Sequence, residues 1–122
     1  AAYAAEPDAH GPEEFDVLML GVGPDSHIAS LFPGRPELEV RDRSTVPVTG
    51  SPKPPPERVS LTYAALARSR ATWLLVSGEA KAEAVARALS PAGTTVEETP
   101  ASGVSGREET VWFLDRAAAS RL

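Results

Sequence analysis

The chain has 122 residues, of which 42% are hydrophobic and 24% charged, a balance typical of one folded domain. The net charge of −5 argues against a nucleic-acid-binding surface, because such a surface needs a basic face to contact phosphates. The absence of cysteine excludes disulfides and thiolate sites, and no apolar run reaches the roughly 20 residues that cross a bilayer. No secretory signal is recognisable at the start, and we expect a cytoplasmic protein without a membrane partner.

The first structured pattern surrounds a short apolar run. Residues 1–14 are Ala-rich and then polar, and we expect the end of a helix leading into a loop. Residues 15–20 are almost continuously apolar, which predicts a buried strand of a parallel sheet. The glycines and proline of residues 21–26 predict a turn, and a short helix is expected at residues 27–32.

The middle of the chain is rich in proline. Residues 34–57 are expected to be a rigid surface loop, although an interdomain linker is an alternative. Residues 58–61 alternate in polarity and predict a short strand. Thr62 then has the character of an N-cap for a helix over residues 63–68.

The last third alternates strand and helix patterns. Residues 71–76 and 110–114 predict two further strands, and residues 79–89 predict a helix with one apolar face. Asp115 is expected to cap a final Ala-rich helix. This alternation predicts an α/β fold, a mostly parallel sheet with flanking helices.

A candidate site follows the first predicted strand. Ligands of open parallel sheets bind beyond the carboxyl ends of the strands, where the turn containing Gly21 and Gly23 lies. His27 follows this turn, and an imidazole can take a proton from water near neutral pH, with Asp25 to orient it. The alternative is an ordinary strand–turn–helix segment in which Asp25 or Ser26 is only the N-cap.

A second candidate group lies in the proline-rich loop. Lys53 and Arg58 flank a stiff stretch that would hold a cation in place for a phosphate. The alternative is that both are solvated loop charges. Lys81, near the start of a predicted helix, is expected on the surface.

Four blocks of sequence resemble one enzyme family, in the same order. They are FDVLMLGVGPDSHIASLFPG at residues 15–34, SPKPPPERVSLT at 51–62, SGEAKA at 77–82 and TVWFLD at 110–115. The blocks are similar to those of 6-phosphogluconolactonases, and the resemblance covers nearly the whole chain from residue 15.

The resemblance implies the NagB/RpiA-type fold of sugar-phosphate isomerases and glucosamine-6-phosphate deaminases. It implies hydrolysis of 6-phosphogluconolactone in the oxidative pentose phosphate pathway, without a metal or organic cofactor. His27 matches the family's general base, Asp25 the acidic residue beside it, and Lys53 and Arg58 the basic positions near the phosphate. The turn residues Gly21, Gly23 and Ser26 would contact the substrate, and we expect backbone N–H groups of the glycine turn to stabilise the oxyanion.

Two departures from the family pattern matter. Ser26 stands where the family usually has glycine, and we expect a modest change of turn geometry. The family's N-terminal half, with the first strands, a phosphate loop and an arginine, has no counterpart here. We therefore expect residues 1–122 to be a single partial domain whose partners are a phosphosugar lactone and that half. The alternatives are a deaminase-like enzyme or a truncated, non-catalytic phosphosugar-binding or interaction fragment.

Overall fold

The computed structural model describes residues 14–52 and 54–122. The expectation for residues 1–13 and the position of Lys53 lie outside these described residues. The elements, in chain order, are β1 (Phe15–Leu20), η1 (Pro36–Glu39), β2 (Thr45–Val48), β3 (Arg58–Leu61), α2 (Tyr63–Leu66), β4 (Ser69–Val76), η2 (Glu79–Lys81), α3 (Ala82–Ala88), η3 (Pro100–Gly103) and β5 (Glu109–Leu114).

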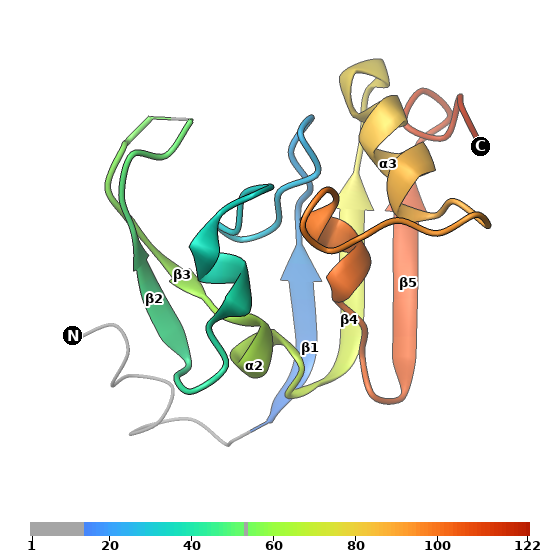
Figure 1. Ribbon diagram of the computed structural model, residues 1–122. Helices are drawn as coiled ribbons and strands as arrows, with labels where there is room; N and C mark the ends of the chain where they lie inside the picture. Colours follow the sequence, from blue (N-terminus) through green and yellow to red (C-terminus); the bar gives the residue numbers. More distant parts are fainter. Residues whose placement is uncertain (1–13, 53) are drawn as a thin grey trace.

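The centre of the fold is a parallel sheet, as the sequence predicts. Its strand order is β1-β4-β5, and both neighbouring pairs are parallel, with Leu20 opposite Leu74 and Leu74 opposite Trp112. The predicted strands are thus confirmed, with β4 beginning two residues early because Ser69 already pairs with Phe15. In Figure 1 the antiparallel β2–β3 ribbon lies beyond β1, on the side opposite β5.

The two faces of the parallel sheet differ in burial. One face packs Leu18, Leu20, Leu74 and Val76 against α2, α3 and η3, which lie over that face in Figure 1. The other face leaves large apolar side chains exposed: Val17, Met19, Leu75 and Phe113 are between 38% and 64% exposed. Each strand therefore alternates between a covered side and an open one, as its two-residue period requires.

The predicted helix at residues 27–32 is wrong. These residues form a tight turn in which Ile28 and Leu31 pair as an isolated β-bridge, and Ala29 has φ 49°, outside the helical region. Ile28, Leu31 and Phe32 are all at most 1% exposed. Burial of three neighbouring apolar residues on different sides of the segment overrides the helix that the local pattern favours.

The structure also corrects four other predicted elements. The predicted loop at residues 34–57 contains η1 and β2. Strand β2 accommodates Pro47 because each strand of a two-stranded ribbon is an edge strand, where a residue without a backbone N–H is tolerated. The predicted helix at 79–89 divides into η2 and α3, and the one at 63–68 shortens to α2 with Thr62 as its N-cap, as expected.

The final Ala-rich helix is absent: residues after Asp115 form turns, although the Asp115 carboxylate does accept the N–H of Ala118 at 2.8 Å.

Among the described residues, no helix combines the length and apolar character that a membrane crossing requires.

Candidate active site

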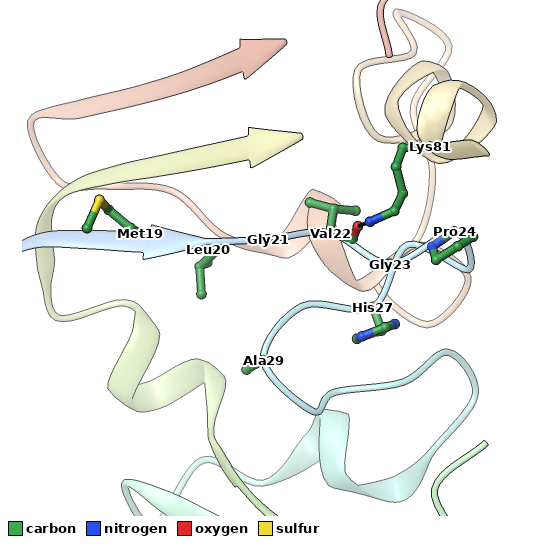
Figure 2. Close-up of a pocket in the computed structure, with 9 residues that line it drawn as sticks. All are labelled: Met19, Leu20, Gly21, Val22, Gly23, Pro24, His27, Ala29 and Lys81. Carbon is green, nitrogen blue, oxygen red and sulfur yellow. Dashed lines mark hydrogen bonds between the residues drawn. The ribbon is translucent and has the colours of Figure 1, made fainter. Parts of the chain in front are cut away.

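A pocket of about 480 Å³ lies at the carboxyl end of β1. It is lined by Met19, Leu20, Gly21, Val22, Gly23, Pro24, His27, Ala29 and Lys81. Figure 2 shows the turn after β1 bringing the His27 ring beneath the backbone of Gly23, while Lys81 reaches in from the segment after β4. The candidate site is therefore where sheet topology predicts a ligand, beyond the carboxyl ends of adjacent parallel strands.

His27 and Asp25 form a close pair. The imidazole Nδ1 lies 2.6 Å from Asp25 Oδ1, and the His27 backbone N–H donates to the same oxygen at 3.1 Å. An ionised carboxylate only accepts hydrogen bonds, so Nδ1 carries the proton of the neutral ring and Nε2 keeps its lone pair. Partial burial acts to raise the pKa of Asp25, but the hydrogen bonds from His27 outweigh it and hold that pKa below its usual value. The pair is arranged so that Nε2 can accept a proton.

Gly23 makes room for the imidazole. A Cβ at this position would lie 2.0 Å from His27 Nδ1 and 2.1 Å from Cε1, far inside any real contact. The Gly23 N–H donates to the His27 carbonyl at 2.9 Å, which closes the turn. The predicted oxyanion role therefore does not fall to this N–H group. Gly21 lines the same pocket, and a Cβ there would meet nothing within 4 Å.

Ser26 is in the left-handed backbone region, with φ 71°, a conformation that favours glycine. Its side chain is completely buried, and its hydroxyl donates to the Asp25 carbonyl at 2.5 Å and lies 3.4 Å from the Glu98 carbonyl. Ser26 is not among the residues that line the pocket. Its hydroxyl thus braces the turn from within, and a contact between Ser26 and the substrate stays a prediction.

Arg58 begins β3 and is held by its neighbours. Its guanidinium donates to the carbonyls of Pro54 at 2.8 Å and Pro55 at 3.1 Å, and it lies 3.5 Å from the Ser30 hydroxyl. Its Cζ stands 5.6 Å from the centroid of the Phe32 ring, which itself contacts His27. The structure thus connects two of the predicted site residues through one aromatic ring. Lys53 lies outside the described residues.

Lys81 is the site residue that sequence reasoning placed on the surface. It is partly buried, lines the pocket, and its ammonium donates to the carbonyl of Val22. Its position just after the carboxyl end of β4 was the available signal, since residues there share a sheet edge with the turn after β1. In the part of the chain that the structure describes, no group of three or more His, Cys, Asp or Glu side chains is placed to hold a metal.

The chain is similar in sequence and in fold to known proteins. Residues 1–112 match the family model of glucosamine-6-phosphate isomerases/6-phosphogluconolactonase. The chain is 53% identical to a 6-phosphogluconolactonase of Streptomyces coelicolor, over all of this chain and 49% of that protein. It superimposes on the 6-phosphogluconolactonase of Trypanosoma brucei with a TM-score of 0.84 at 26% identity, over 99% of this chain and 51% of that one.

A second kind of enzyme is also similar in structure. A monomeric glucosamine-6-phosphate deaminase matches with a TM-score of 0.74 and 28% identity, over 99% of this chain and 53% of that one. The chain spans about half the length of the curated relatives it matches. With the family model covering residues 1–112 and the parallel sheet and histidine turn in place, the chain belongs to the glucosamine-6-phosphate isomerase/6-phosphogluconolactonase family.

Proposed function

We propose that the full-length protein hydrolyses 6-phosphogluconolactone to 6-phosphogluconate. The observation that carries this proposal is the 2.6 Å contact between His27 Nδ1 and Asp25 at the edge of a pocket that Lys81 also lines. The identity to 6-phosphogluconolactonases, 53% with the Streptomyces protein, supports this substrate over other sugar phosphates.

In the proposed reaction, His27 Nε2 accepts a proton from a water molecule as its oxygen attacks the lactone carbonyl carbon. The bond between that carbon and the ring oxygen then breaks, and the proton passes from the imidazolium to the departing ring oxygen. Asp25 holds Nδ1 as a donor throughout and stabilises the positive charge that the ring acquires. Water is consumed and a carboxylic acid and a hydroxyl are formed, so the step balances without another reactant.

Arg58 is proposed to bind the phosphate, together with Lys53. Hydrogen bonds to Pro54 and Pro55 hold the guanidinium, and the long 3.5 Å contact to Ser30 is the one that a phosphate oxygen would most easily replace. Lys81 lines the pocket itself and adds positive charge that favours an anionic substrate. An acidic chain can in this way offer a local cationic site.

The rest of the domain is proposed to cover the open face of the sheet. Met19 supports this, because it is 64% exposed on that face and also lines the pocket that His27 lines. Whatever packs on Met19 would therefore also form a wall of the pocket. We accordingly expect activity from the full-length protein and little from residues 1–122 alone. A cytoplasmic location remains part of the proposal, in keeping with a chain that lacks cysteine.

The test is turnover of 6-phosphogluconolactone by the full-length protein, measured as NADPH formed by added 6-phosphogluconate dehydrogenase above the rate of spontaneous hydrolysis. His27→Ala is expected to lower kcat by about 10²–10⁴. Undiminished turnover in that variant would remove His27 from the mechanism.

The same preparation tests the two alternatives. Release of ammonia from glucosamine-6-phosphate would favour the deaminase, to which this fold is also similar. Binding of 6-phosphogluconate without turnover of any lactone, in the full-length protein, would favour a non-catalytic binding role.

A further inference from the structure

Phe32 lies between His27 and Arg58. The proposed reaction places the lactone carbonyl at His27 and the phosphate at Arg58. Its ring centroid lies 4.6 Å from that of His27, with the planes tilted by 32°. On the same ring, the Arg58 guanidinium carbon lies 5.6 Å from the centroid. One side chain therefore contacts both the proposed base and the proposed phosphate ligand.

The Phe32 ring is itself held firmly. It is 1% exposed and belongs to a small apolar cluster with Val46 and Val48 of β2. The backbone just before it is tied to β3, because the Ser30 N–H donates to the Ser60 hydroxyl at 3.0 Å. The strand that carries Arg58 is thus joined to the segment that carries the ring, and the ring has little freedom to follow either neighbour.

We propose that Phe32 is a positioning residue that sets the separation between the imidazole and the guanidinium, and so favours lactones with a distant phosphate. This inference rests on the proposed function. An aromatic face attracts a guanidinium, and a tilted ring pair fixes the orientation of an imidazole. A rigid spacer between the two groups selects the substrate whose ester and phosphate are separated by the matching length.

The closing experiment compares Phe32→Leu with Val46→Ala in the full-length protein. Leucine keeps an apolar side chain in the cluster but removes the ring, whereas Val46→Ala weakens the same cluster and leaves the ring in place. For each variant, kcat and KM are measured on 6-phosphogluconolactone and on unphosphorylated gluconolactone. Thermal unfolding of each variant shows that activity is compared in folded protein.

The expected result is a loss of preference for the phosphorylated lactone. Phe32→Leu should lower the ratio of the two kcat/KM values about fivefold or more, from the lost cation–π contact, while Val46→Ala leaves the ratio unchanged. In an Arg58→Ala background, Phe32→Leu should no longer change the ratio, because the effect passes through the guanidinium. An unchanged ratio in Phe32→Leu, or an equal change in Val46→Ala, would overturn the role of Phe32 while leaving the lactonase proposal intact.

A result independent of turnover separates the two proposals. The NMR resonance of the His27 Nδ1 proton should broaden in Phe32→Leu, because a less ordered imidazole exchanges that proton with water faster, and should stay sharp in Val46→Ala. If the wild-type protein hydrolyses neither lactone, the proposed function and the selectivity role fail together. The NMR comparison then still decides whether Phe32 orders the imidazole, and a resonance that stays equally sharp in Phe32→Leu overturns that part too.

Discussion

Replacing Gly23 with alanine should displace the imidazole of His27 without unfolding the chain. The added Cβ would lie 2.0 Å from Nδ1 and 2.1 Å from Cε1, whereas carbon contacts settle at about 3.5–4 Å, so the ring must move by more than about 1 Å. The ring cannot turn in place, because Nδ1 is bound to Asp25 at 2.6 Å and Phe32 packs 4.6 Å away.

The size of the effect follows from this geometry. A misplacement of about 1 Å in a reacting group costs roughly 10² in rate, so kcat for 6-phosphogluconolactone should fall by about that factor. Loss of the partly exposed hydrogen bond to Asp25 should lower the free energy of unfolding by only about 1 kcal/mol. The assay is the coupled measurement of turnover in the full-length protein, with thermal unfolding of the same samples.

Gly106→Ala provides the matched control. A Cβ there would lie 2.1 Å from the Glu109 carbonyl, at the opposite end of the sheet from the pocket, so it should destabilise the fold without moving His27. The folded molecules of the Gly106→Ala variant should keep the kcat of the wild-type protein. Wild-type kcat in Gly23→Ala, or an equal loss per folded molecule in Gly106→Ala, would refute the steric argument.

Three further predictions follow from the same residues. The pKa of Asp25 in the folded chain lies below its ordinary value of 3.8. The Asp25 carboxylate therefore contributes folding stability that is fully present above that ordinary pKa and is lost as the pH falls through the lower pKa of the folded state. The difference in unfolding temperature between the wild-type protein and Asp25→Asn should accordingly be present at pH 7 and shrink in acid, and a pH-independent difference would contradict this. Ala29→Gly should raise the free energy of unfolding by up to about 1 kcal/mol in denaturant titrations, because φ 49° strains alanine; a loss of stability would show that the backbone there is unstrained. Thr62→Val should lower the free energy of unfolding by about 1–3 kcal/mol and Thr62→Ser should lower it little, because the buried hydroxyl donates to the Arg43 carbonyl at 2.6 Å and accepts from the Ala65 N–H. Equal stability of the two variants would rule out the hydroxyl as the cause.

The sheet was predictable from sequence because its strands are defined by short, local apolar runs. Such a run occurs in each of the three strands, Phe15–Leu20, Ser69–Val76 and Glu109–Leu114. The segments between these strands are long enough for the crossover connections that parallel strands need. The turn of residues 27–32 was not predictable in the same way. Its shape depends on packing of Ile28, Leu31 and Phe32 into parts of the fold that are distant in sequence.

In the candidate site, too, local contacts were predictable from sequence and contacts between distant residues were not. The pairing of His27 with Asp25 was open to prediction because both lie in one turn and need only local geometry. Lys81 and Phe32 were not singled out, because their contacts at the site are with residues far along the chain: Val22 for Lys81 and Arg58 for Phe32. The complete burial of Ser26 was not predictable either, since no spacing rule says whether a turn hydroxyl faces a pocket or the interior.

Met19 links the chemistry of the site to the incomplete packing of the sheet. Its neighbour Leu20 is buried among the helices, so the two-residue period of β1 sends Met19 to the open face. Yet Met19 lines the pocket together with His27. The imidazole is thus positioned by contacts inside residues 14–122, while one boundary of the pocket is an apolar side chain that is 64% exposed. A substrate held only from the His27 side would remain in contact with water, which weakens each charged interaction that binds it. The hydrogen-bonded imidazole and an enclosed pocket would therefore have separate physical origins, and the second depends on what covers the open face of the sheet.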